Sequence, residues 1–231
     1  IYIGIKEVNS GSTYIGNCHK IVLWRKEELL KVVIHEMLHC LEMDFHNFPI
    51  ELNNLLKKYM NIDKDTELKI FEAYVETWAT ILNTLLTSID ICNNYTNIKK
   101  KINLFINYEI CFSCFQAAKI LLFYGFEKFQ DFFNLDKKKI ITSAKIRQNS
   151  SIISYYIIRS ALLFSLNNFF DFCKQNNFDQ KSDISFLKFN ETTKCFHNFS
   201  DLIIKSFNNQ KYQKYINRIM KRLYLQSHKN L

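Results

Sequence analysis

The stretch Val33-Ile34-His35-Glu36-Met37-Leu38-His39-Cys40-Leu41 organises the rest of the chain. It reads His-Glu-x-x-His inside an apolar run that favours a helix. On a helix, two imidazoles four residues apart project from one face, as two ligands of a single metal ion must. Glu36 is rotated about 100° around the helix from His35, so it can reach a metal-bound water. The stretch therefore predicts a metal site, against the alternative of a helix that merely carries two histidines.

Composition favours a globular, mostly helical protein. Of the 231 residues, 48% are hydrophobic and 15% aromatic, which is well above a disordered composition. Four glycines and one proline are too few for an all-β fold with many turns, and they favour long helices.

Local patterns predict a small antiparallel sheet before the motif. Residues 1–5 read as a strand, and residues 13–15 and 19–24 flank Gly16-Asn17, a typical two-residue hairpin turn. The motif helix is expected at residues 26–43. Further helices are expected at residues 68–89, 97–124, 127–134, 149–175 and 199–225, with a connector at 137–143 and a surface loop at 176–190.

These elements predict an α+β fold that is predominantly α-helical. Residues 1–95 are expected to form a lobe that contains the small antiparallel sheet and a pair of site helices. Residues 96–231 are expected to form an all-helical lobe that closes a cleft over that pair. We expect the two lobes to pack as a single compact unit.

A catalytic zinc site needs a third protein ligand and an open position for water. A histidine six residues after His39 would supply it, but that position is Phe45. His46 lies one residue late and Asp44 one residue early, so both are weaker alternatives.

Glu72 and Glu76 are better candidates for the third ligand. They lie one helical turn apart and face the same way, within an aromatic and aliphatic segment, residues 71–79, that is typical of burial. Burying two carboxylates without partners costs several kcal/mol each, and a metal with its histidines would supply partners. The alternative is an ordinary amphipathic helix with solvated acids.

The two helices resemble the gluzincin branch of the zincin metallopeptidases, the thermolysin-like arrangement. In that family, His-Glu-x-x-His lies on one helix and Glu-x-x-x-Asp on a downstream helix. The resemblance implies one catalytic Zn²⁺ bound by His35, His39 and Glu72. Glu76 then matches the acidic residue that hydrogen-bonds a ligand histidine, with Glu in place of Asp. A shifted alignment, in which Glu76-Thr77-Trp78-Ala79 resembles the Glu-Gly-Phe-Ala of aminopeptidase relatives, would make Glu76 the ligand.

The resemblance to gluzincins covers about residues 20–85. The whole chain also looks similar to uncharacterised zincin-like proteins of large DNA viruses. The implied activity is zinc-dependent hydrolysis of peptide bonds in a peptide or protein substrate, with Glu36 as general base. The strand before the motif helix would pair with extended substrate through Ile21, Val22, Leu23 and Trp24. The group that stabilises the oxyanion is expected from the second lobe, where Tyr155, Tyr156, Arg159 and His197 are candidates.

The net charge of +9 raises two alternatives. The basic runs at residues 99–101 and 137–139 and a basic C-terminal segment would suit nucleic acid or an acidic surface. Solvated helix faces explain them more simply, and nucleic acid is not an expected partner. The main alternative function is a catalytically inactive zincin-like scaffold that binds through a basic helical surface. A helical nucleic-acid-binding protein with a fortuitous motif is a third hypothesis.

Seven scattered cysteines resemble no disulfide framework, which favours a cytoplasmic or other reducing intracellular compartment. The pair Cys111 and Cys114 reads as small core residues. We see no signal peptide and no apolar run long enough for a membrane span, so a soluble protein is expected. The chain begins at Ile1, which suits a fragment whose start lies upstream.

Overall fold

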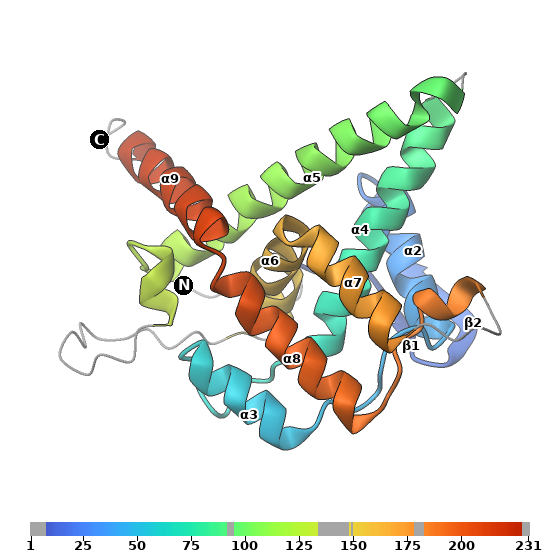
Figure 1. Cartoon of the computed structure of the whole chain (residues 1–231), viewed down its shortest axis with the longest axis horizontal. Helices are drawn as coiled ribbons and strands as arrows, with labels where there is room; N and C mark the ends of the chain where they lie inside the picture. Colours follow the sequence, from blue (N-terminus) through green and yellow to red (C-terminus); the bar gives the residue numbers. More distant parts are fainter. Residues whose placement is uncertain (1–7, 92–94, 134–147, 149, 178–182, 228–231) are drawn as a thin grey trace.

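The structure, a computed structural model, describes residues 8–91, 95–133, 148, 150–177 and 183–227. This part of the chain is predominantly α-helical with one small antiparallel sheet (Figure 1), which confirms the predicted class at that level. The strand predicted at residues 1–5, the connector at 137–143 and the lysines at 137–139 lie outside the described residues.

The sheet consists of β1 (Gly11–Tyr14) and β2 (Asn17–Leu23), which pair in antiparallel fashion. Tyr14 opposes Asn17, so the turn is Ile15-Gly16 rather than the predicted Gly16-Asn17. Gly16 has a φ of +71°, and this left-handed position is the one that requires glycine. Asn17 is therefore free to begin the second strand.

The predicted motif helix is α2 (Leu29–Cys40), which is shorter at both ends than residues 26–43. Glu42 adopts a left-handed φ of +54°, its amide bonds the carbonyl of His39, and the Met43 amide bonds the carbonyl of Leu38. This pattern is a Schellman motif, which stops a helix and reverses the chain. The residues that follow, from Asp44 onward, are thereby turned back towards α2.

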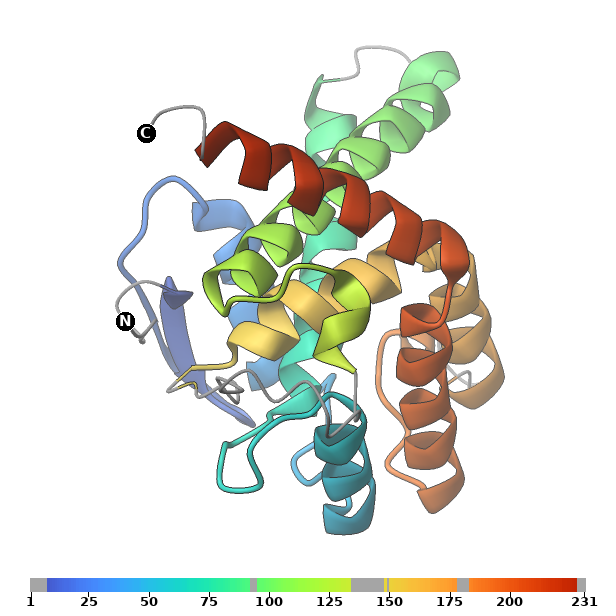
Figure 2. The same cartoon turned by 90° about the vertical axis from the view of Figure 1, so that its left-hand side faces the viewer.

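Two further helices complete the first half of the chain, α3 (Ile50–Tyr59) and α4 (Ile70–Ile91). Helix α4 packs along α2, and the β-hairpin packs on α2 as well (Figure 2). Helix α4 buries its apolar face together with Glu76 and a ladder of Thr and Ser hydroxyls that bond carbonyls one turn back. Residues 70–91 therefore form a largely buried helix against which α2 packs.

The second half begins with the long helix α5 (Tyr95–Phe123), close to the predicted 97–124. The helix predicted at residues 127–134 is a short 3₁₀ turn, η1 (Phe129–Phe132). The helix predicted at residues 149–175 is divided into a π-helical segment, η3 (Ile153–Ile158), then α6 (Arg159–Phe164) and α7 (Leu166–Asn176). Ser165, with φ −103° and ψ 36°, breaks the continuous helix.

The predicted surface loop at residues 176–190 contains a short 3₁₀ turn, η4 (Asp183–Phe186). The helix predicted at residues 199–225 is two helices, α8 (Thr193–Phe207) and α9 (Gln210–Ser227). They separate at Asn209, whose side-chain oxygen accepts a hydrogen bond from the Lys211 amide and competes with helix continuation. Helix α9 packs across α5, and one hydrophobic cluster takes residues from both predicted lobes.

A disulfide joins Cys18 on β2 to Cys40 at the end of α2. The cysteine pattern predicts no disulfide framework, and this single bond forms because the hairpin folds back onto α2 and brings together two cysteines that are 22 residues apart. The pair Cys111 and Cys114 is not joined; Cys114 lies in the core as expected, but Cys111 is exposed, so the prediction was wrong for Cys111.

One described helix segment, Asn97–Phe123, is long and apolar enough to cross a membrane by length and composition alone. The segment is not an uninterrupted apolar run, because residues 99–101 near its start are lysines. A single helix of this kind is a weak indication, since core helices pass the same test.

Candidate metal centre

Three potential ligand atoms meet at one point between α2 and α4. His35 Nε2 lies 3.1 Å from His39 Nε2, and each lies 3.3 Å from Glu72 Oε2. Ligand atoms held at 2.0–2.1 Å by a tetrahedral ion are about 3.3 Å apart, and these are the bond lengths that zinc makes with nitrogen and oxygen. The triangle of His35, His39 and Glu72 therefore fits a metal ion that leaves one further position open.

The Nδ1 atom of each histidine is within hydrogen-bond distance of a carboxylate. His35 Nδ1 lies 2.9 Å from Glu76 Oε2, and His39 Nδ1 lies 2.7 Å from Asp44 Oδ2. Because an ionised carboxylate can only accept, each Nδ1 carries a hydrogen, and once a metal displaces any proton on Nε2, the lone pairs of both Nε2 atoms point to the shared position. This second set of contacts fixes the tautomer that a metal ligand needs.

Electrostatics at the cluster favour a bound cation. Burial disfavours the ionised form of Glu72, but its hydrogen bonds to His35 and His39 lower the pKa of its carboxyl to about 2. Burial alone would lower the pKa of His39, but its bonds to Asp44 and Glu72 raise that pKa to about 10. The carboxylates thus stabilise positive charge at the position of the two rings.

The two candidate glutamates on α4 have different positions. Glu72 contributes the oxygen of the triangle, whereas Glu76 sits behind His35 and bonds two cations. Glu76 Oε1 lies 2.5 Å from both Lys31 Nζ and Arg159 Nη1. Burial would raise the pKa of Glu76, but these two charges hold it well below its usual range. This geometry matches the alignment in which Glu72 is the ligand and Glu76 hydrogen-bonds a ligand histidine.

Glu36 lines the cavity next to His35 and is buried, with 5% of its surface exposed. It makes no hydrogen bond to another residue in the part of the chain that the structure describes. Burial raises the pKa of its carboxyl, and the charges of His35 and His39 offset part of that effect. The backbone of Gly11 passes so close that a methyl group there would lie 2.9 Å from Glu36 Oε1.

A cavity of about 320 Å³ opens beside His35 and Glu36. Its walls come from residues 8–11, the start of α2, α4, α5 and the segment around Arg159. Tyr155 and Tyr156 both line it, although they are consecutive in sequence. They belong to the π-helical segment η3, and such wide turns often occur at functional sites.

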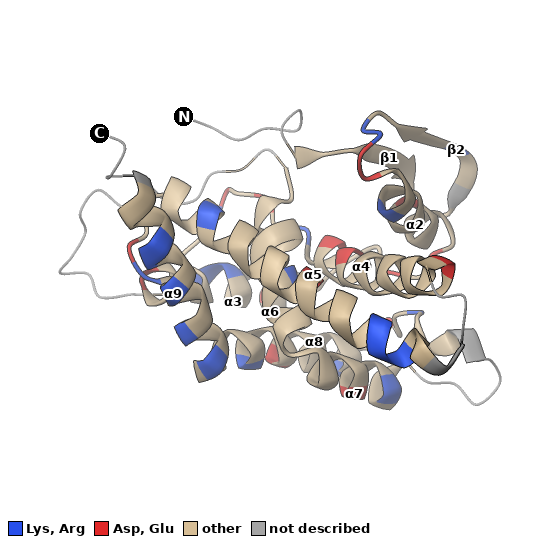
Figure 3. Ribbon diagram, turned by 90° about the horizontal axis from the view of Figure 1, so that it is seen from above, with Lys and Arg blue, Asp and Glu red and all other residues tan. Residues whose placement is uncertain are grey.

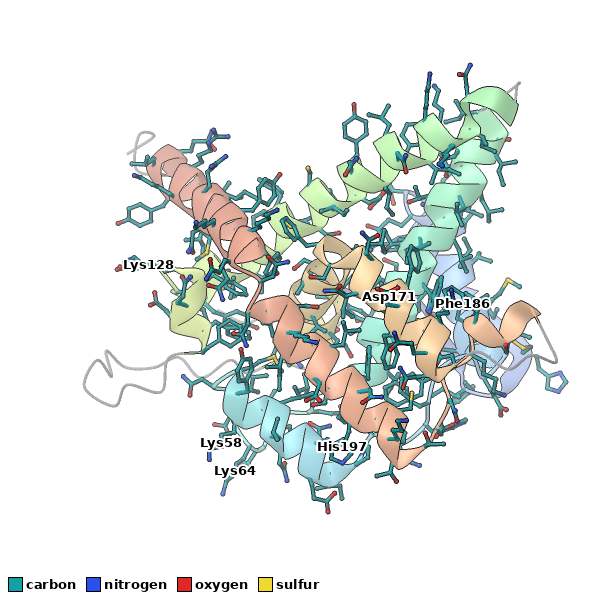
Figure 4. All side chains as sticks on the ribbon, in the orientation of Figure 1. Lys58, Lys64, Lys128, Asp171, Phe186 and His197 are labelled. Carbon is teal, nitrogen blue, oxygen red and sulfur yellow. A yellow bond between two sulfur atoms is a disulfide. The ribbon has the colours of Figure 1, made fainter. Side chains whose placement is uncertain are left out.

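The predicted oxyanion candidates differ in their positions. The Tyr155 ring stands edge-on to His35, with centroids 6.0 Å apart. Arg159 is bound to Glu76, and its guanidinium lies over the Tyr156 ring at 5.9 Å. His197 is exposed on α8, which packs on α3 away from the triangle (Figure 4). The structure therefore brings both tyrosines and Arg159 to the site, but not His197.

Two other predictions concern residues near the motif. The predicted substrate strand, Ile21, Val22, Leu23 and Trp24, corresponds to the end of β2 and the residue after it, and none of these residues lines the cavity. Residues 8–11 line it instead, because the hairpin places the start of β1 against Glu36. His46 is exposed and lies 3.8 Å from Glu191, so it takes no part in the triangle.

The sequence reading missed two contributors, Lys31 and Asp44. Lys31 precedes His35 by one turn of α2, so its position on the same helix face was a usable signal. The sequence pattern indicates Asp44 only as an alternative metal ligand. Its hydrogen bond to His39 Nδ1 depends on the chain reversal after Leu41.

No family model and no solved structure matches this chain. The chain is similar to a viral protein, "Uncharacterized protein R210" of Acanthamoeba polyphaga mimivirus, with 28% identity over 195 residues. The match takes in 81% of this chain and 46% of the relative, so the chain spans less than half of that protein's length.

Proposed function

We propose that this chain is a zinc-dependent metallopeptidase of the gluzincin type that acts on peptides or proteins. The observation that carries the proposal is the triangle of His35, His39 and Glu72 beside a cavity that also holds a buried, unpaired Glu36. Two histidines and one glutamate are the zinc ligands of thermolysin-type enzymes. A fold with a motif helix, a supporting glutamate helix and a hairpin beside them suits the zincin arrangement.

When bound at this site, zinc supplies a water of lowered pKa and polarises the scissile carbonyl. Glu36 faces the cavity from the same helix, so it is placed to take the proton of the attacking water and deliver it to the leaving amine. Its burial raises the pKa of its carboxyl towards the range that suits a general base. Glu76 and Asp44 hold the two imidazoles with Nε2 directed at the metal position.

Tyr155 is the preferred donor to the developing oxyanion. Burial and the charges of Glu72 and Glu76 raise the pKa of its phenol well above the usual value, so the hydroxyl stays protonated at neutral pH. Arg159 forms an ion pair with Glu76, and its role is to keep that carboxylate in contact with His35 Nδ1. Substrate backbone would lie along residues 8–11, which form the cavity wall next to Glu36.

A catalytically inactive scaffold with the same metal site is the second candidate. Lysine and arginine residues recur along α9 (Figure 3), and this basic helix favours a binding role. The buried Glu36 favours catalysis, because a purely structural metal site needs no carboxylate facing an adjacent cavity.

Paired variants separate these functions. We expect the purified protein to bind one equivalent of zinc, Glu36→Gln to retain it, and Glu72→Gln to lose most of it. With a mixed peptide library, wild type should cleave and Glu36→Gln should not. Glu51→Gln, an exposed change of the same charge on α3, serves as the control. Equal turnover by wild type and Glu36→Gln would reject the peptidase, and zinc binding without cleavage would favour the scaffold.

A further inference from the structure

The cavity beside the candidate metal centre has a charge composition that differs from the rest of the protein. Although the chain has a net charge of +9, the cavity is lined by five glutamates and two cations. Both cations, Lys31 and Arg159, are bound to the same oxygen of Glu76. No ion pair joins Glu27, Glu28, Glu36 or Glu109 to a described residue, although the charges of Arg159 and Lys31 offset part of the effect of burial on the pKa of Glu109.

Three of these carboxylates, Glu27, Glu28 and Glu109, line the cavity and are at least partly exposed to solvent. Glu28 is the residue before α2, and its side chain makes no capping hydrogen bond. Glu27 precedes it and is also exposed. Glu109 on α5 is half-buried and forms no ion pair with a described residue, and burial raises the pKa of its carboxyl. Half-burial of an unpaired carboxylate costs free energy that a cationic ligand would recover.

Aromatic rings next to these acids also suit a cation. Phe112 on α5 lines the cavity with 53% of its surface exposed, one turn beyond Glu109. Tyr156 lines the same space and already has the Arg159 guanidinium over its ring at 5.9 Å. Aromatic faces attract ammonium and guanidinium groups, and the alkyl stem of a long cationic side chain packs on them.

We propose that this cavity selects substrates that carry a cationic group near the scissile bond, held by Glu109 together with Glu27 and Glu28. The inference rests on the proposed peptidase function and names its substrate class. The cationic group belongs either to a lysine or arginine side chain or to the N-terminal amine of the substrate. The volume of about 320 Å³ is sufficient for either.

A binding experiment tests this inference without any need for substrate turnover. Fluorescent peptides that differ only in lysine or norleucine at one position are titrated, by anisotropy, against zinc-loaded Glu36→Gln protein. Each peptide is made with a free and with an acetylated N-terminus. A salt bridge to a half-buried carboxylate contributes on the order of 1 kcal/mol, so we expect binding about fivefold tighter for the cationic peptide. The preference should weaken as salt concentration rises.

Glu109→Gln should abolish most of the preference, whereas Glu51→Gln on α3 should leave it unchanged. A preference that follows lysine identifies a side-chain site, and one lost on acetylation identifies an N-terminal amine site. Equal affinity for all four peptides would overturn the inference, as would a preference that survives in Glu109→Gln. The proposed function is judged separately, by Glu36-dependent cleavage of any peptide in the mixed library.

Discussion

His39 Nδ1 lies 2.7 Å from Asp44 Oδ2, and this contact exists because the Schellman motif turns the chain back immediately after α2. Asp44 has no exposed side-chain surface, and its second carboxylate oxygen has no hydrogen-bond partner among the described residues. The negative charge of Asp44 therefore acts mainly on the His39 imidazole.

Asp44→Asn should weaken zinc binding. The amide oxygen can still accept from Nδ1, but the loss of negative charge makes His39 a poorer ligand, and such changes lower metal affinity about 10–100-fold. Competition with a chromogenic chelator measures the dissociation constant. Asp201→Asn, an exposed change on α8, is the control. Unchanged affinity in Asp44→Asn would mean that this contact does not tune the ligand.

Arg159→Met should destabilise the metal-free protein more than Lys31→Met does. Both cations bond Glu76 Oε1, but the Arg159 side chain is 5% exposed and that of Lys31 is 21% exposed, so water can replace only the lysine. Removing one partner of a buried ion pair costs about 3–5 kcal/mol, and we expect about 1 kcal/mol for Lys31. Urea unfolding measures both changes.

The Glu76→Gln background checks the cause of this difference. With the carboxylate neutralised, Arg159→Met should cost markedly less than it does in the wild type. An equal cost in both backgrounds would assign the effect to packing of the arginine stem rather than to the ion pair.

These contacts also show what the sequence could and could not predict. The spacing of His35 and His39, and of Glu72 and Glu76, follows from helix periodicity, so both ligand pairs were predictable from local pattern. The bond between Arg159 and Glu76 joins residues 83 positions apart and depends on how the segment after residue 150 packs on α4. No local pattern carries that information.

The same limit applies to the errors in the predicted elements. Residues 149–175 have a continuous helical pattern, and the break at Ser165 lies between two helices, α6 and α7, that both pack into the core. The cavity wall at residues 8–11 was missed because strand propensity does not indicate which strand lies against α2. Tertiary packing decides both features.

Gly11→Ala should reduce activity with little effect on zinc binding. The added methyl group would lie 2.7 Å from Val32 Cγ1 and 2.9 Å from Glu36 Oε1, so the hairpin or Glu36 must move. Overpacking of this kind costs about 1–3 kcal/mol, and we expect kcat to fall at least about tenfold. Ser12→Ala, on the exposed side of β1, is the control. Wild-type kcat in Gly11→Ala would show that Glu36 does not need this close contact.

Removal of the Cys18–Cys40 disulfide should destabilise the fold and make stability insensitive to reductant. The bond closes a loop of 22 residues that contains most of β2 and all of α2, and cross-links of this size contribute about 3 kcal/mol. Urea unfolding of metal-free protein with and without a phosphine reductant should therefore differ for wild type and coincide for Cys18→Ser.

Cys111→Ser, at an exposed free cysteine, should keep the wild-type response to the reductant. Because Cys40 directly follows His39 and the Gly16 amide bonds the His39 carbonyl at 3.3 Å, loss of the tether should also loosen the end of α2. The zinc affinity of Cys18→Ser should then fall by a smaller factor than that of Asp44→Asn, since the contacts of the His39 imidazole with Asp44 and Glu72 remain. If wild type unfolds identically with and without reductant, the disulfide contributes nothing to the stability of this site.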